Sequence, residues 1–253
     1  MSIKGFAVAL LLGAVAALPT ADKVNTLWQM PDLSFGLYSG YVPISGSSKQ
    51  LHYVMALSQR AWQTDPVIVW FNGGPGCSSM LGFLQEHGPY ALEDGASAFT
   101  PNAYSWNKEA TMIYIEAPAG VGYSLCPVAT ECVYNDFNSA DDNLQALLAV
   151  LGTKFPELQK NDLYISGESY AGIYVPRLVE RVDWYIGNCT ANKSCAFIPN
   201  LKGFIVGNGV TDYKFDNQEA LFEMIFWYGF ISTETYFNIK NNCLGDTQPP
   251  ECT

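Results

Sequence analysis

Positive charge is scarce in this chain of 253 residues. Lysine and arginine total 13 against 24 aspartate and glutamate residues, so the formal net charge is −11. A nucleic-acid-binding protein needs a basic surface, and a nucleic-acid partner is therefore not expected. Charged residues make up only 15% of the chain and hydrophobic residues 49%, which argues against disorder and is enough for a full core. We interpret the acidity as that of a soluble protein from an acidic or extracellular compartment.

Long hydrophobic runs are absent beyond the N-terminus. None approaches the roughly 20 apolar residues that a membrane helix needs, so no membrane partner is expected. Residues 1–17 predict a signal peptide, because Lys4 precedes an apolar stretch at residues 6–15 and a small-residue cleavage site at residues 14–16. The alternative is a buried N-terminal helix, but the run is short and Pro19 closes it. We therefore expect the protein to enter the secretory pathway.

The seven cysteines fit that compartment, where disulfides are permitted. Six of them form three pairs of near neighbours: Cys126 and Cys132, Cys189 and Cys195, Cys243 and Cys252. Closing these short loops is plausible, although sequence alone does not fix the connectivity. Cys77 is left without a near neighbour, so it is either a free thiol or disulfide-bonded to a cysteine elsewhere.

Two neighbouring glycosylation signals begin at Asn188 and Asn192 (NCT and NKS). Both fall in a polar stretch bracketed by Cys189 and Cys195, which we interpret as a surface loop. Sequons of secreted proteins occur in such loops. We therefore predict glycosylation at both asparagines.

Apolar runs alternate with helical patterns along the chain. Two strands are predicted at residues 35–44 and 51–57, around a turn. Four continuous apolar runs suit strands that are buried on both faces, namely residues 67–71, 112–115, 163–165 and 203–206. Leucines at 144, 147, 148 and 151 have helical spacing, and Pro156 ends that helix. The alternation predicts an α/β fold around a largely parallel sheet.

The segment after Asp212 differs from the rest. Between residues 219 and 237 it is rich in aromatic side chains with helical spacing. Either a core-facing helix or a lid over a cleft would explain this pattern.

Residues 167–172 (GESYAG) follow a predicted strand and precede a helical segment at residues 173–182. Small residues around a serine at such a junction form a nucleophile elbow, which lifts the serine hydroxyl above the sheet edge. Ala171 replaces the usual last glycine of the short pattern. Ser169 is therefore the candidate nucleophile.

Residues 72–79 (NGGPGCSS) form a glycine-rich loop directly after a buried strand. The glycines permit close approach of the backbone to a ligand. Together with the N–H after the nucleophile, N–H groups of such a loop can form an oxyanion hole. A phosphate loop is disfavoured because no lysine follows the glycines, whereas an ordinary glycine-rich turn is the simpler alternative.

Five motifs in this order resemble the serine carboxypeptidase family, the group that includes cathepsin A and the vacuolar carboxypeptidases. They are NGGPGCSS at 72–79, EHGP at 86–89, EAPAGVGYS at 116–124, GESYAG at 167–172 and GNG at 207–209. The resemblance covers essentially the whole chain after the signal peptide. It implies an α/β-hydrolase fold, a peptide substrate with a free C-terminal carboxylate, and a lysosomal, vacuolar or extracellular location.

The resemblance also implies roles for individual residues. Ser169 matches the nucleophile, and Gly74 and Tyr170 match the residues whose N–H groups form the oxyanion hole. The group that binds the C-terminal carboxylate of the substrate matches Asn72, Gly73, Glu86 and Glu168. Two carboxyl groups held close together cannot both stay ionised, so they share a proton, and the protonated one can donate a hydrogen bond to the substrate carboxylate. No metal or cofactor is implied.

The histidines depart from the family pattern. The family's triad runs Ser, Asp, His, with both partners far downstream of the serine, whereas the two histidines of this chain, His52 and His87, precede Ser169. Without a base, a serine hydroxyl is a weak nucleophile. We interpret the chain as a truncated α/β-hydrolase, with core residues 18–211 and the start of a helical cap insertion at residues 212–253. The resemblance further implies that Cys77 bridges to the missing C-terminal part, a possible partner.

Three functions fit this sequence. The first is a fragment of an active carboxypeptidase that works through an acyl-enzyme. The second is acyl transfer on the same scaffold, since a fold does not determine a reaction. The third is a non-catalytic product that binds or protects a partner. The oligomeric state and the substrate side-chain preference do not follow from the sequence.

Overall fold

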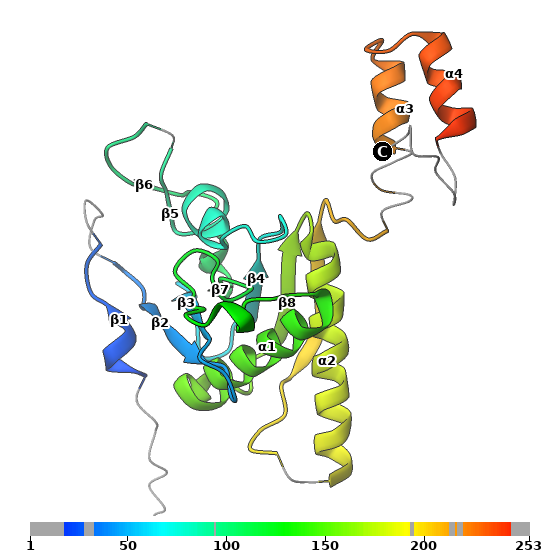
Figure 1. Cartoon of the computed structure of the whole chain (residues 1–253). Coiled ribbons are helices and arrows are strands. Elements are labelled where there is room, and N and C mark those ends of the chain that lie inside the picture. The colour runs from blue at the N-terminus through cyan, green and yellow to red at the C-terminus, as the bar shows by residue number, and fades with distance from the viewer. Residues whose placement is uncertain are drawn as a thin grey trace, which may run out of the picture.

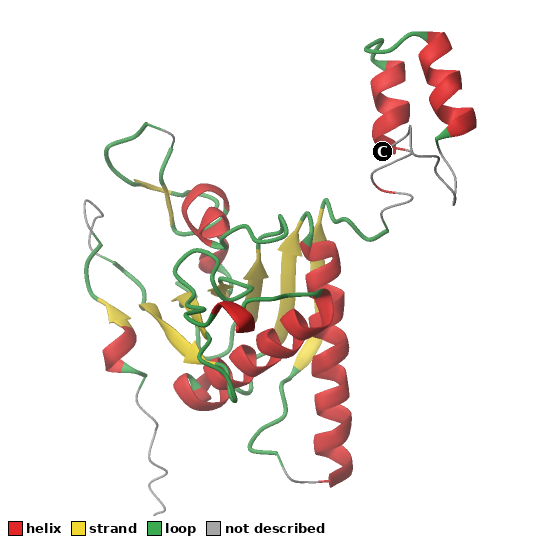
Figure 2. Ribbon diagram, in the orientation of Figure 1, coloured by secondary structure: helices red, strands yellow, loops and turns green. Residues whose placement is uncertain are grey.

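A computed structural model describes residues 18–27, 33–93, 95–192, 195–212, 216 and 220–243. A twisted sheet forms its centre, with helices α1 and α2 against one face (Figures 1 and 2). The signal peptide predicted at residues 1–17 lies outside the described residues. The predicted α/β architecture is confirmed.

The central sheet of the described residues has seven strands in the order β1-β2-β3-β7-β4-β8-β9. The strands span Lys23–Val24 (β1), Leu37–Pro43 (β2), Gln50–Ala56 (β3), Thr111–Ile115 (β7), Val67–Phe71 (β4), Leu163–Glu168 (β8) and Leu201–Gly207 (β9). The last four strands of this order run parallel, and β1, β2 and β3 pair antiparallel. The sheet is therefore mixed, and its parallel part consists of the four apolar runs that the sequence predicted.

Two long helices cover one face of this sheet. Helix α1 spans Asp136–Ala149 and helix α2 spans Ala171–Asn192. The side chain of Asn135 begins α1 by accepting hydrogen bonds from the N–H groups of Phe137 and Asn138, which satisfies donors that the first helical turn leaves unpaired. No helix in the described part of the chain is both long enough and apolar enough to span a membrane.

Short elements complete the described fold. A small two-stranded sheet joins β5 and β6, at Tyr90–Ala91 and Thr100–Pro101. Short helical turns lie at Thr20–Asp22, Gly82–Glu86, Trp106–Lys108, Ala129–Glu131, Val150–Lys154 and Pro156–Leu158. The turn at Val150–Lys154 prolongs α1 as far as the residues before Pro156, as the sequence predicted.

The core lies on both faces of the sheet, because the parallel strands are apolar throughout. Ile113 and Ile115 of β7 face α1 and α2, while Met112 and Tyr114 of the same strand face the opposite layer. All four are fully buried. Since successive side chains of a strand point to opposite faces, a continuous apolar run requires cover on both sides, and β7 has it.

The aromatic segment after Asp212 is helical, as predicted, but it forms two helices. Helix α3 spans Ala220–Trp227, and α4 spans Thr233–Asn242. Phe226 of α3 stacks on Tyr236 of α4, with ring centroids 3.9 Å apart. No residue of α3 is buried, and Trp227 is 77% exposed. This exposure disfavours a core-facing helix, and the cap insertion at residues 212–253 stays a prediction.

Two of the three expected disulfides are present, Cys126–Cys132 and Cys189–Cys195. Cys243 is also disulfide-bonded, and Cys252 lies outside the described residues. Cys77 is free and exposed, as the residue count predicted. Its bridge to a further part of the protein stays a prediction.

The prediction of a surface loop around the glycosylation signals is wrong. Helix α2 continues ten residues beyond the predicted end at residue 182, and Asn188 and Asn192 lie in its last turns. The Cys189–Cys195 disulfide ties this end of the helix to the following segment. The last two residues of the second signal, 193 and 194, lie outside the described residues, and glycosylation stays a prediction.

Replacing Leu147 tests the packing of α1 on the sheet. This side chain is fully buried, so Leu147→Ala leaves a cavity and is expected to lower the free energy of unfolding by about 2–5 kcal/mol. The measurement is urea denaturation followed by circular dichroism. Leu125 is 45% exposed, and Leu125→Ala is the matched control, with an expected loss below about 1 kcal/mol. Equal losses in the two variants would contradict the described core.

Candidate active site

Ser169 stands at a sharp turn between strand β8 and helix α2. Its φ is +58°, a left-handed conformation that non-glycine residues rarely adopt. A Cβ on Gly167 would lie 2.4 Å from the carbonyl oxygen of Phe71, and one on Gly172 would lie 2.4 Å from that of Val210. Only glycine fits on either side of this turn. The strand–turn–helix arrangement predicted around Ser169 is present.

Hydrogen bonds to the backbone hold this turn on the sheet. The N–H of Ser169 donates to the carbonyl of Gly207 at 3.0 Å, and the N–H of Val210 donates to the carbonyl of Ser169 at 2.9 Å. The Ser169 residue itself is exposed. Its hydroxyl is therefore presented to solvent at the carboxyl end of the parallel strands, the usual place for a ligand in such sheets.

The glycine-rich loop touches the turn directly. A Cβ on Gly73 would lie 2.4 Å from the backbone nitrogen of Tyr170 and 2.9 Å from Cβ of Ser169. Gly74 follows with a φ of +112°. Farther along the loop, the N–H of Gly76 donates to the hydroxyl of Tyr174 at 3.2 Å. The structure thus brings the glycine-rich loop into contact with the Ser169 turn. The oxyanion-hole roles of Gly74 and Tyr170 and the binding role of Gly73, which the resemblance implied, stay predictions.

Three residues expected to bind a carboxylate form one hydrogen-bonded group. The Nδ2 of Asn72 donates to Oε1 of Glu86 at 3.1 Å and to Oε1 of Glu168 at 3.0 Å. The Oδ1 of Asn72 accepts from the indole N–H of Trp70 at 2.9 Å and from the N–H of Gly82 at 3.0 Å. Both ends of the amide are thus occupied, which fixes the two carboxyl groups beside each other.

Burial raises the pKa of Glu86, and the negative charge of Glu168 raises it further, against the opposing hydrogen bond from Asn72. The hydrogen bond favours the ionised form, but burial and the like charge prevail. Glu86 therefore keeps its proton to a higher pH than an ordinary glutamate does. A proton shared between Glu86 and Glu168 stays a prediction.

Both histidines of the chain are engaged away from Ser169. His87 stacks on Trp106 with centroids 4.3 Å apart, its Nδ1 lies 3.1 Å from the Tyr114 hydroxyl, and burial lowers its pKa to about 4. His52 is buried, with its Nδ1 2.8 Å from Oε2 of Glu116. In the described residues neither ring is hydrogen-bonded to Ser169. Both rings are held within the packed part of the fold by these contacts.

Glu116 is a buried acid to which the sequence analysis gave no role. It accepts hydrogen bonds from the Ser78 hydroxyl and, at 2.8 Å, from the N–H of Tyr123. Burial acts to raise its pKa, but these bonds and the one with His52 outweigh burial, and the pKa is lowered. Glu116 thus anchors the far end of the glycine-rich loop. The signal in the sequence was its place at the start of the motif EAPAGVGYS, directly after a buried strand.

Comparison with known proteins gives a consistent result. A family model described as serine carboxypeptidase matches residues 28–252. Serine carboxypeptidase-like 20 of Arabidopsis thaliana is 41% identical over 215 residues, which cover 83% of this chain and 42% of that protein. Serine carboxypeptidase ctsa-4.1 of Caenorhabditis elegans is 38% identical, over 90% of this chain and 46% of that protein. The lysosomal protective protein of Mus musculus is 36% identical, over 93% of this chain and 48% of that protein.

A solved structure shows the same fold. The prohormone-processing carboxypeptidase KEX1(DELTA)P of Saccharomyces cerevisiae superimposes on this chain with a TM-score of 0.67 at 23% identity, over 88% of this chain and 52% of that one. The α/β-hydrolase fold expected from the sequence is confirmed. The chain spans about half the length of the curated relatives that it matches.

The coupling between the two glutamates can be measured directly. We expect the carboxyl carbon of Glu86, followed by NMR, to titrate above the ordinary glutamate range. In Glu168→Gln its pKa should fall, because the neighbouring negative charge that raises it is gone. Glu180→Gln removes an acid that pairs with Arg177 on the surface of α2 and serves as the control. A Glu86 titration unaffected by Glu168→Gln would contradict the coupling.

Proposed function

The chain belongs to the serine carboxypeptidase family, and we propose that the whole protein removes C-terminal residues from peptides through an acyl-enzyme on Ser169. The observation that carries this proposal is the group formed by Asn72, Glu86 and Glu168 beside the Ser169 turn. Paired carboxyl groups that share a proton suit a substrate whose own carboxylate lies next to the bond to be cut.

Recognition of the substrate carboxylate rests on that proton. The protonated Glu86 donates a hydrogen bond to the substrate's C-terminal carboxylate, while two ionised glutamates would repel it. Asn72 holds both acids in place through its amide. Gly73, which leaves no room for a side chain against Tyr170 and Ser169, allows the substrate carboxylate to lie close to the backbone.

Bond cleavage then follows the course of serine hydrolases. The hydroxyl of Ser169 attacks the carbonyl carbon of the last peptide bond and loses its proton to a histidine base, which passes the proton to the departing amine. The N–H groups of Gly74 and Tyr170 stabilise the negative oxygen of the tetrahedral intermediate. Water next releases the shortened peptide from the serine. The chemistry needs no cofactor.

Neither histidine of these 253 residues is placed to act as the base for this reaction. His52 is bonded to Glu116 and Ser39, and His87 is neutral and packed among aromatic rings. Neither can take the proton of Ser169 without leaving its site. We propose that a histidine and an aspartate from a further part of the protein complete the triad, with Cys77 joined to that part by a disulfide.

The proposed location is the secretory pathway, with a lysosome, a vacuole or the exterior as its end point. One relative is named lysosomal protective protein. The disulfides Cys126–Cys132 and Cys189–Cys195 suit an oxidising compartment. An acidic compartment would also keep the proton between Glu86 and Glu168.

The 253-residue chain alone is expected to show no peptidase activity, because no histidine is placed at Ser169. The measurement is release of the C-terminal amino acid from blocked dipeptides at acidic pH, with correct folding verified by circular dichroism. Clear turnover that Ser169→Ala abolishes would contradict this. In the whole protein, the same substitution should cost on the order of a million-fold in kcat, as in other serine triads.

Hydrolysis by the whole protein should fall as pH rises through the raised pKa of Glu86. The sign follows from the protonated form, which is present below that pKa and lost above it. Substrates with a C-terminal amide need no carboxylate recognition and should lose less activity over the same range. The measurement is kcat/KM for matched peptides that end in a free acid or an amide, across this pH range. Identical profiles for the two substrates would argue against the roles of Glu86 and Glu168.

A further inference from the structure

The imidazole of His87 is a buried titratable group that the proposed reaction leaves without a role. The residue is 7% exposed. Its Nδ1 lies 3.1 Å from the Tyr114 hydroxyl, whereas its Nε2 is buried and has no hydrogen-bond partner among the described residues. A buried polar atom without a partner is costly. A group that can meet Nε2 is therefore expected within reach of the ring.

The carboxyl group of Glu86 lies within that reach. Its Oε2 is 4.0 Å from Nε2 of His87, about 1 Å beyond the length of a hydrogen bond. Its Oε1 already accepts from the amide of Asn72 at 3.1 Å, which leaves Oε2 for the ring. The side chain of Glu86 is partly exposed, so a small rotation of the carboxyl group closes the gap.

Aromatic neighbours fix the position of the ring itself. Trp70 of β4 meets His87 edge to face, with centroids 4.2 Å apart, and Trp106 stacks on it at 4.3 Å. Tyr114 of β7 lies nearly parallel to the imidazole at 5.5 Å. The N–H of Trp106 also donates to the carbonyl of His87 at 3.0 Å. The ring is therefore held in advance, and the movement falls to Glu86.

These surroundings keep His87 neutral. The titratable groups against the ring are Tyr114 and Glu86, and Glu168 of β8 faces Glu86 across the amide of Asn72. Burial lowers the pKa of His87 to about 4. Above that pH the imidazole has one N–H and one lone pair. It can therefore accept a hydrogen bond without carrying a positive charge.

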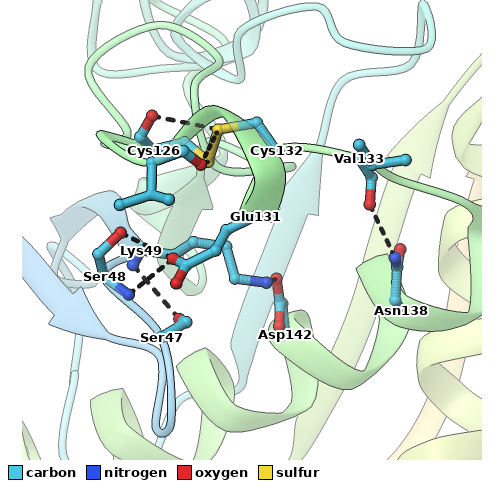
Figure 3. Close-up of a disulfide and its surroundings, with 10 residues drawn as sticks. Ser47, Ser48, Lys49, Cys126, Glu131, Cys132, Val133, Asn138 and Asp142 are labelled. Carbon is cyan, nitrogen blue, oxygen red and sulfur yellow. Dashed lines mark hydrogen bonds and ion pairs between the residues drawn. A yellow bond between two sulfur atoms is a disulfide. The ribbon is translucent and has the colours of Figure 1, made fainter.

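Other acids of the fold are met by donors or cations instead. Figure 3 shows Glu131, whose carboxylate accepts from the N–H and the hydroxyl of Ser48, and Asp142, which pairs with Lys49. The bonds from Ser48 lower the pKa of Glu131. Glu86 has no lysine or arginine partner among the described residues, and burial favours its protonated form.

A protonated carboxyl group adds an O–H donor that needs an acceptor. Asn72 offers Glu86 only an N–H, because the amide oxygen already accepts two other hydrogen bonds. Nε2 of His87 can accept when the ring proton lies on Nδ1 and is donated to the Tyr114 hydroxyl. With the proton on Nε2 the ring would instead donate to Glu86 and favour the ionised form. A protonated Glu86 thus selects the tautomer with a lone pair on Nε2.

We propose that His87 is a positioning residue for the group formed by Asn72, Glu86 and Glu168. Its neutral ring accepts a hydrogen bond from Glu86 at Nε2 and so keeps on that carboxyl group the proton that a substrate carboxylate needs. The inference rests on the proposed function, which gives that proton its use. When substrate binds, Glu86 turns its O–H from His87 to the substrate carboxylate. One hydrogen bond replaces another, and no proton leaves the group.

NMR of the 253-residue chain tests the contact. In the unaltered chain, the ¹⁵N shifts of His87 should show a proton on Nδ1 and none on Nε2. His87→Phe keeps an aromatic ring but removes the acceptor, so the pKa of Glu86 should fall. The added apolar surface acts in the opposite direction, so a fall reports the lost acceptor. In His87→Gln a side-chain oxygen can accept in place of Nε2, and the pKa of Glu86 should stay raised.

Three results would overturn the inference. They are a ring proton on Nε2, a pKa of Glu86 that is unchanged or higher in His87→Phe, and an equal fall in His87→Phe and His87→Gln. The first measurement uses the unaltered chain, so it decides the question even where a variant fails to fold.

Binding to the whole protein carrying Ser169→Ala separates this inference from the proposed function. Blocked dipeptides are titrated by calorimetry across pH, each as free acid and as amide. Equal affinity for acid and amide, or no binding of either, would speak against the proposed function alone. Where the acid is preferred, added His87→Phe should weaken its binding about tenfold above the pH at which binding declines, the size of one hydrogen bond. Binding on the acidic plateau should persist, and a uniform loss at every pH would mark a merely structural role and contradict the inference.

Discussion

The contact between Gly73 and the Ser169 turn is the constraint on which the site depends. Two segments nearly 100 residues apart meet there with no space for a Cβ, which would lie 2.4 Å from the Tyr170 nitrogen. The neighbouring strands β4 and β8 pair in parallel, up to Phe71 and Gly167, and deliver both segments to the same edge of the sheet. The backbone N–H groups proposed for the oxyanion hole and the amide of Asn72 take their places from this contact.

Buried polar groups stabilise the segments that the contact brings together. Both ends of the Asn72 amide form hydrogen bonds. Its oxygen accepts from Trp70 and Gly82, and its nitrogen donates to the two glutamates. Glu116 anchors the loop's far end through Ser78. Because an unpaired buried polar atom is costly, these satisfied networks favour one loop conformation. Rigid donors of this kind are what transition-state stabilisation requires.

The two carboxyl groups beside the Ser169 turn depend on each other electrostatically. Asn72 donates to both Glu86 and Glu168 through one amide. Burial and the charge of Glu168 together raise the pKa of Glu86 against that hydrogen bond. An environment of this kind suits an anionic ligand only while a proton is present.

The sequence by itself determined the parallel strands, the Ser169 turn and the glycine-rich loop, since each depends on local requirements: apolar runs for burial on both faces, and glycine where a Cβ has no room. It also led to Asn72, Glu86 and Glu168, but only through the family resemblance. Tertiary structure alone decided that one amide holds both glutamates and that Glu116 anchors the loop. These relations join residues far apart in the chain, where no periodicity or short motif records the contact. The helix at Asn188 was missed for a different reason. The polar residues and cysteines there are typical of a loop, yet Cys189 is buried in the last turns of α2 and its disulfide to Cys195 ties down the end of the helix.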